Sequence, residues 1–161
     1  MKTSRNKATL GSDPRNETGA IAVLAVAAGR ETYGFPLSAV REIVAPPPVA
    51  EVPRAAPSVL GVISVRGQII TLVDLCKVLN LHVEQPATYG RVLLVDNGEE
   101  LIGVAVDRVI QVFRLEPHQI EYASGMGAEL SDYVVGVGRV ATGDERERML
   151  ILINPVSLLG G

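Results

Sequence analysis

The chain has 161 residues and a net charge of −3 at pH 7, and 47% of its residues are hydrophobic while only 4% are aromatic. This length suits one domain or two small ones that share a core. The charge gives no reason to expect nucleic acid as a partner. No apolar run reaches the roughly 18 to 20 residues of a membrane span, so no direct membrane insertion is expected.

The N-terminal residues 1–18 are polar and charged, and they lack the apolar core of a signal peptide. We interpret this segment as a disordered tail that carries no site. The only cysteine is Cys76, so no intrachain disulfide can form. A cytoplasmic protein is the expectation from these features.

Short β-branched runs, broken by 16 glycines and 10 prolines, predict an all-β fold with many short strands. In the first half of the chain, the sequence predicts three strands, a proline-rich extended segment, a hairpin and a helix that Asp74 caps. The expected strands are Ile21 to Ala28, Thr32 to Leu37 and Arg41 to Ala45, and the helix is Leu75 to Asn80.

The second half begins after an expected linker at residues 82 to 89. A turn at Asn97-Gly98 separates two of its strands, and Asn154 with Pro155 opens a short closing helix through Leu159. The segment from Glu116 to Ser131 is expected to be looser. The predicted strands are residues 91–96, 101–106, 109–114, 133–141 and 149–153.

The stretch Gly61 to Leu75, GVISVRGQIITLVDL, predicts two strands joined by a tight turn at Arg66-Gly67. Gly67 supplies the permissive backbone of such a turn. If the strands pair across it, the alternation of side chains is expected to put four apolar residues on one face and leave Ser64, Arg66 and Gln68 on the other. The four are Ile63, Val65, Ile69 and Val73.

The chain nearly repeats itself, which indicates two related modules. Val23 to Val26 matches Val92 to Val95, and without any gap Gly34 then matches Gly103. We therefore predict two β-barrels of about five strands, a first copy at residues 19–82 and a second copy at residues 83–161. The same alignment matches Val40 with Val109 and Ile43 with Val112, and later segments match Gly61-Val62 with Gly136-Val137 and Ile69 to Val73 with Met149 to Ile153.

Function is best sought where the copies differ. The first copy carries Arg41-Glu42 where the second carries Ile110-Gln111, and the tight turn at Arg66 is replaced by a longer charged loop from Thr142 to Arg148. An ion pair between Glu42 and Arg66 is plausible. If exposed, such a pair contributes only about 0 to 1 kcal/mol to stability, so a recognition role explains these two residues better.

No motif for catalysis, a metal or a cofactor stands out. His82 and His118 are far apart and lie near no second metal-ligand motif. Cys76 is expected to be a buried, inert thiol. Helix capping accounts for Asp74, and turn chemistry accounts for Asp96 and Asp107.

The sequence resembles the CheW family of bacterial chemotaxis adaptors. The resemblance runs from about residue 20 to residue 160, through TYGFPLSAVREIV, GVISVRGQIITLVDL, LIGVAVDRVIQV and YVVGVG followed by MLILINPVSLL. The chain departs from the family pattern at Ser64, where Asn is usual, at Thr71, where Pro is usual, and in the length of the loop from Thr142 to Arg148.

The resemblance implies two five-stranded SH3-like barrels with a shared apolar seam and short helices after each module. It implies a non-enzymatic adaptor that joins the regulatory domain of a CheA-type histidine kinase to the cytoplasmic tips of methyl-accepting chemoreceptors, recruited to receptor arrays at the membrane. It gives no single residues for the kinase-facing surfaces. Carried over by position, the receptor-facing surface is implied to include Val40, Glu42, Ile43, Gly61, Val65 and Arg66.

Alternatives remain for these residues and for the whole chain. Val40, Ile43 and Val65 also fit a plain core role, and Gly61 fits a backbone position that no side chain can occupy. A small ligand-binding or catalytic module with a pocket between the barrels is the rival function. A chemosensory adaptor for pili or gene expression is a third reading, within the family.

Overall fold

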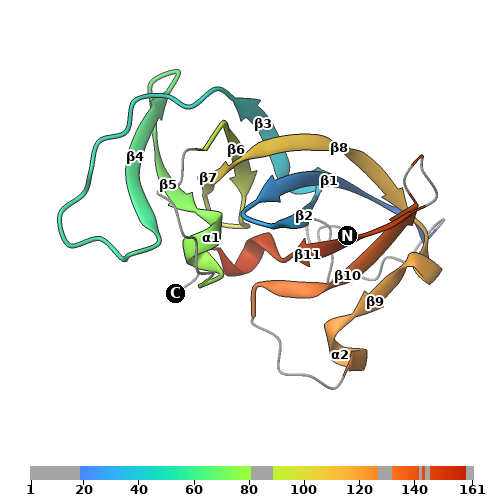
Figure 1. Cartoon of the computed structure of the whole chain (residues 1–161). Helices are drawn as coiled ribbons and strands as arrows, with labels where there is room; N and C mark the ends of the chain where they lie inside the picture. Colours follow the sequence, from blue (N-terminus) through green and yellow to red (C-terminus); the bar gives the residue numbers. More distant parts are fainter. Residues whose placement is uncertain (1–18, 81–88, 127–131, 142, 144–145, 159–161) are drawn as a thin grey trace, which may run out of the picture.

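A computed structural model describes residues 19–80, 89–126, 132–141, 143 and 146–158 of the chain. The predicted tail at 1–18 and most of the predicted linker lie outside these residues. Among the described residues, strands dominate and helices are single turns (Figure 1). The strands are β1 Ile21–Ala28, β2 Glu31–Pro36, β3 Val40–Val44, β4 Val59–Val65, β5 Gln68–Asp74, β6 Arg91–Asp96, β7 Leu101–Val106, β8 Arg108–Leu115, β9 Ile120–Tyr122, β10 Val134–Ala141 and β11 Glu147–Ile153.

These strands form two sheets, as the prediction of an all-β fold with two modules requires. The six-stranded sheet has the order β8-β1-β2-β11-β10-β9, and the five-stranded sheet has the order β3-β6-β7-β5-β4. Neighbouring strands are antiparallel except for β2 with β11 and β5 with β7, which are parallel. The two sheets thus have the same plan, in which β3, β6, β7, β5 and β4 correspond to β8, β1, β2, β11 and β10.

Each sheet draws strands from both copies of the repeat. The six-stranded sheet takes β1 and β2 from the first copy and the remaining four strands from the second, while β3, β4 and β5 join β6 and β7 in the five-stranded sheet. The two sheets therefore do not coincide with the segments 19–82 and 83–161. Local patterning shows which face of a strand is buried but not which sheet it joins, and the two copies have nearly the same pattern.

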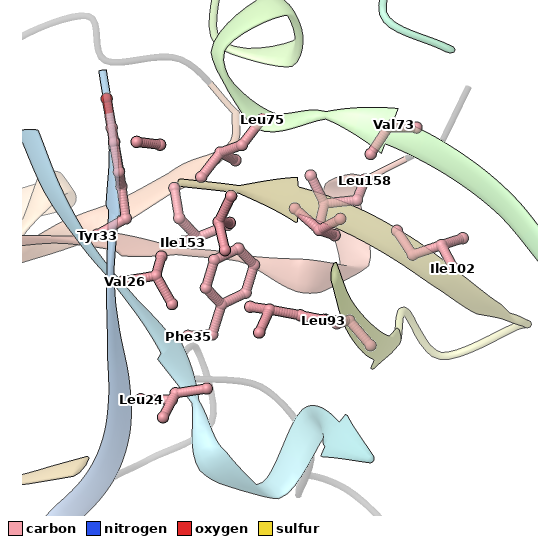
Figure 2. Close-up of a cluster of buried hydrophobic side chains, with 14 of the residues drawn as sticks. Leu24, Val26, Tyr33, Phe35, Val73, Leu75, Leu93, Ile102, Ile153 and Leu158 are labelled. Atoms are coloured by element: carbon pink, nitrogen blue, oxygen red, sulfur yellow. The ribbon is translucent and has the colours of Figure 1, made fainter. Parts of the chain in front are cut away.

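Three apolar clusters hold the sheets together. One fills the interior of the six-stranded sheet, around Val23, Leu115 and Leu152. A second fills the five-stranded sheet, around Ile63, Leu72 and Val92. The third and largest cluster lies between the sheets, and Figure 2 shows that strands of both sheets contribute its side chains. We call it the seam cluster. Its labelled members are Leu24, Val26, Tyr33, Phe35, Val73, Leu75, Leu93, Ile102, Ile153 and Leu158.

Alternation along β1 and β6 explains why both faces of these strands are buried. In β1, Val23 belongs to the interior of its own sheet while Leu24 belongs to the seam, and Val92 and Leu93 of β6 divide in the same way. Near-continuous apolar runs result. The buried seam agrees with the shared apolar seam that the family resemblance implied.

Shorter elements complete the chain and correct some expectations. α1 Leu75–Val78 is capped by Asp74, as predicted, but it is shorter than expected. The short turn η1 Leu37–Ala39 follows β2, with Pro36 at its N-cap position and no capping hydrogen bond from a side chain. The segment expected to be loose holds η2 Pro117–Gln119, β9 and α2 Ala123–Met126, and the closing helix is the short turn η3 Pro155–Ser157, which Asn154 caps.

Candidate protein-contact site at the Arg66 hairpin

The hairpin of β4 and β5 ends in a two-residue turn, as the sequence predicts. Val65 pairs with Gln68, so Arg66 and Gly67 alone form the turn. Their φ angles are +49° and +83°, and two positive φ values are the requirement of a type I′ hairpin turn. A non-glycine residue seldom adopts such a φ, so Arg66 is held at the tip by the geometry of the hairpin.

The guanidinium of Arg66 binds the carboxylate of Glu42 through two hydrogen bonds. Nη1 donates to Oε2 at 3.0 Å, and Nη2 donates to Oε1. This fork-to-carboxylate geometry gives orientation as well as attraction. The pair remains accessible, because 70% of the Arg66 side chain and 36% of the Glu42 side chain are exposed.

The hydrogen bonds within this pair change the pKa values of both side chains in the direction that favours the charged forms. The bonds from Arg66 hold the pKa of the Glu42 carboxyl below its usual value. The bonds to Glu42 raise the pKa of Arg66 in turn. Both groups therefore stay charged at neutral pH.

The ion pair joins the two edges of one sheet. Glu42 lies on β3 and Arg66 follows β4, and these are the outer strands of the five-stranded sheet. Their side chains meet because the sheet curls into a barrel, as small all-β modules do to limit exposed edges. The site is thus a consequence of barrel closure.

The other four predicted site residues lie on the same two strands. Val40 is half-buried and packs against the seam, and Val65 is half-buried and packs against the interior of the five-stranded sheet. Ile43 is 42% exposed. A Cβ on Gly61 would lie 2.3 Å from the carbonyl oxygen of Ala50, so a close backbone approach accounts for this glycine.

The predicted division of the hairpin into faces is wrong for Ile69, Val73 and Gln68. Val73 lies in the seam cluster and not with Ile63, and Gln68 pairs with Val65 and shares its face. Ile69 pairs with Ser64 and is 68% exposed, whereas Ile70 pairs with Ile63 in the interior. Residues opposite each other in a hairpin share a face, so counting outward from a two-residue turn would have found this arrangement. An apolar side chain therefore lies on the solvent face of β5, in the strand that leaves the Arg66 turn.

A second ion pair on β3 also escaped the sequence analysis. Arg41 Nη2 donates to Asp96 Oδ2 at 2.8 Å, and Arg41 Nη1 donates to the carbonyl oxygen of Ser38 at 2.7 Å. The sequence predicts a turn role for Asp96, and its Oδ1 does accept from the backbone N–H of Gly98. The carboxylate serves both the turn and Arg41.

Residues considered for chemistry lie elsewhere. Asp74 accepts from the backbone N–H groups of Cys76 and Lys77, at 2.9 and 3.4 Å. Burial raises the pKa of the Cys76 thiol, and the carboxylates of Asp74 and Asp107 raise it further. His118 is exposed, and His82 lies outside the described residues. In the part of the chain that the structure describes, no group of three or more metal-ligating side chains is gathered, and no helix is long and apolar enough to cross a membrane.

Comparison with protein families gives a match that spans nearly the whole chain. The family model of the CheW-like domain matches residues 22–161. A protein named chemotaxis protein CheW from Klebsiella aerogenes is 30% identical over 135 residues, covering 81% of this chain and 76% of that protein. Another of the same name, from Helicobacter pylori, is 23% identical over 155 residues, covering 96% of this chain and 91% of that protein.

A solved structure has the same fold. The crystal structure of the scaffolding protein TtCheW from Thermoanaerobacter tengcongensis matches with a TM-score of 0.71 and 24% sequence identity, covering 83% of this chain and 88% of that chain. At this identity the likeness concerns the fold alone.

Proposed function

The chain belongs to the CheW-like domain family, and from that premise we propose that it is a non-enzymatic chemotaxis adaptor. It couples the cytoplasmic tips of methyl-accepting chemoreceptors to the regulatory domain of a CheA-type histidine kinase. It acts in the cytoplasm and is recruited to receptor arrays at the membrane. The names of the relatives, which are chemotaxis proteins, support this assignment.

The observation that carries the proposal is the accessible Glu42–Arg66 pair. The first copy alone supplies these residues, since the second copy has Gln111 where the first has Glu42 and a longer loop where it has the Arg66 turn. An exposed pair adds little to stability. Interface arginines, by contrast, are often residues on which binding depends strongly.

The proposed receptor-facing surface consists of the two strands that carry this pair. Glu42 and Arg66 supply its charges, and Ile43 supplies exposed apolar area. Val40 and Val65 are half-buried supports, and Gly61 acts through the close approach of its backbone to Ala50. No single residues are proposed for the surfaces that face the kinase.

The rival function was a binding or catalytic module with its pocket between the barrels. The space between the sheets is filled by the seam cluster, whose members Phe35, Leu93 and Ile153 are fully buried. Packing of this kind favours a rigid body that presents surfaces over one that encloses a ligand.

The test is co-sedimentation of adaptor variants with kinase and receptor. Arg66→Ala is expected to leave the free energy of unfolding within about 0.5 kcal/mol of the parent value. The same change should weaken receptor assembly by roughly 2 kcal/mol, and Glu42→Ala should give a similar loss. The double variant should be less than additive if the residues act as a pair.

Arg139→Ala is the matched control. Arg139 is an exposed arginine of the second copy, and its Nη2 lies 3.6 Å from Oε1 of Glu121, so it too forms an exposed ion pair. Its loss should leave assembly unchanged. If Arg66→Ala melts normally and still assembles fully with receptor, the receptor-facing surface lies elsewhere. If it melts far below the parent, Arg66 is a structural residue.

A further inference from the structure

β3 presents two consecutive charged residues, and each is bound by a different partner. Arg41 binds Asp96 and the carbonyl oxygen of Ser38, while Glu42 binds Arg66. The two pairs are distinct although Arg41 and Glu42 are neighbours in sequence and opposite in charge. The arrangement thus prevents the simplest alternative, an ion pair between Arg41 and Glu42.

Because of a β-bulge at Arg41, an ion pair between Arg41 and Glu42 competes with the two observed pairs. Val40 pairs with Val95 and Glu42 with Leu94, so Arg41 is the extra residue on its strand. A bulge disrupts the regular alternation of side chains and re-aims those next to it. Arg41 and Glu42 are therefore not held to opposite faces of the sheet as successive strand residues normally are.

The second copy has the same bulge without the charges. Ala25 pairs with Gln111 and Val26 with Val109, so Ile110 is the extra residue there. In the gapless alignment of the two copies, Ile110 aligns with Arg41 and Ala27 aligns with Asp96. Both members of the Arg41–Asp96 pair are thus replaced by apolar residues in the barrel that lacks the Glu42–Arg66 pair.

Stability does not explain the Arg41–Asp96 pair. The side chains are 48% and 36% exposed, and pairs this exposed contribute little. The carboxylate of Asp96 is, however, fixed in place, because its other oxygen accepts from Gly98 N–H at 2.8 Å. A fixed carboxylate and the Ser38 carbonyl together occupy both terminal nitrogens of Arg41.

We infer that Asp96 is a positioning residue for the proposed receptor-facing site: it holds Arg41 away from Glu42, so that the Glu42 carboxylate is committed to Arg66. This inference rests on the proposed function for its biological role, but the geometry it describes can be tested without receptor. Asp96 itself touches neither Glu42 nor Arg66 in the contacts that the described residues make.

The test uses Asp96→Asn, Arg41→Ile and the double variant. The asparagine keeps an oxygen for Gly98 N–H but removes the charge that binds Arg41, and the isoleucine is the residue of the second copy. Asp96→Asn should lower receptor assembly about twofold to fivefold, the effect of losing one exposed ion pair. Arg41→Ile should assemble like the parent, and the double variant should recover because the competing arginine is gone.

A second measurement needs only the adaptor. The pKa of the Glu42 carboxyl, followed by carbon NMR, should rise on Arg66→Ala in the parent and in the Arg41→Ile/Asp96→Asn background. In the Asp96→Asn background the rise should be much smaller, since Arg41 then binds the carboxylate. Arg41→Gln replaces the isoleucine variant if that protein aggregates.

Receptor assembly and the NMR titration of Glu42 together distinguish a failure of the positioning role of Asp96 from a failure of the proposed receptor-binding role. An Arg66→Ala effect on the Glu42 pKa that is the same in all three backgrounds overturns the inference, and so does an Asp96→Asn defect that Arg41→Ile fails to rescue. If the NMR cycle behaves as expected while Arg66→Ala and Glu42→Ala bind receptor normally, the inference stands and the receptor role of the pair is refuted.

Discussion

Gly34 and Gly103 occupy the same position in the two barrels and face the same kind of neighbour. Gly34 pairs with Leu152 across the parallel β2–β11 contact, and Gly103 pairs with Leu72 across the parallel β5–β7 contact. A Cβ would lie 3.0 Å from a Leu152 methyl at Gly34 and 3.1 Å from a Leu72 methyl at Gly103. The repeat in the sequence is therefore a repeat in packing, with a leucine filling the space beside each glycine.

We expect Gly34→Ala and Gly103→Ala to destabilise the protein by similar amounts. Each added methyl overpacks the buried leucine on the parallel neighbouring strand, and overpacking of a dense core costs about 1 to 3 kcal/mol. Urea unfolding of the two variants measures this cost. Gly143→Ala is the control, because a Cβ there meets nothing within 4 Å. If Gly34→Ala lowered the free energy of unfolding and Gly103→Ala did not, the packing at the two parallel strand pairs would not be equivalent.

The sequence predicted the parts of the fold that local signals determine. β1, β6 and β7 have the bounds expected from their apolar runs: β1 ends just before Gly29, β6 begins just after Gly90, and residues 97–100 connect β6 to β7. β9 was missed because a three-residue strand carries almost no periodic signal. The exchange of strands between barrels was not predictable, since near-identical copies offer each strand two equivalent sheets.

The candidate site was predictable to the same extent. Glu42 and Arg66 were found because one copy carries them and the other does not, and the structure joins them. Asp96 was missed as a partner of Arg41 because 55 residues separate the two in sequence. A role in the turn already accounts for Asp96, so nothing in the sequence indicates a second role as the partner of Arg41.

Acid should dissociate the Glu42–Arg66 pair in a measurable way. In the folded protein the pKa of Glu42 lies below its ordinary value, chiefly because its carboxylate accepts hydrogen bonds from Arg66. The contribution of the pair is therefore complete above that ordinary value and is lost as the pH falls through the lowered pKa. Carbon NMR titration should show the Glu42 pKa rising toward its ordinary value in Arg66→Ala. Arg139→Ala should leave the titration of Glu42 unchanged, and an unaltered Glu42 pKa in Arg66→Ala would contradict the contact.

Alkali should destabilise the seam through Tyr33. Burial, with smaller contributions from Cys76 and Glu31, raises the pKa of Tyr33 to about 12, whereas an unfolded tyrosine ionises near pH 10. The unfolded state thus loses its proton first, and stability should fall as the pH rises from about 10 to about 12. The loss from this group is of the order of 2 to 3 kcal/mol.

The measurement is urea unfolding of the parent and of Tyr33→Phe across this pH range. Phenylalanine keeps the ring in the seam and removes the ionisable hydroxyl, so its stability should decline less steeply with pH. Parallel declines for the two proteins would show that other groups account for the alkaline sensitivity.

Separated halves of the chain should not fold alone. A fragment that ends before residue 83 has β1 and β2 without β11 and β8, and it has β3 without β6. The complementary fragment 83–161 lacks β5, which is the parallel neighbour of β7. Each fragment would expose its share of the seam cluster, so neither can bury enough apolar surface for a stable core.

The two fragments should, however, fold when they are mixed, because strand exchange makes each complete the other. Circular dichroism should show no cooperative thermal transition for either fragment and one transition for the mixture. A full chain cut by a protease at a site inserted within residues 81–88 is the control, and it should remain folded after cleavage. A sharp transition for residues 83–161 alone would mean that one barrel forms without borrowed strands, and the shared seam would then not be what holds the fold together.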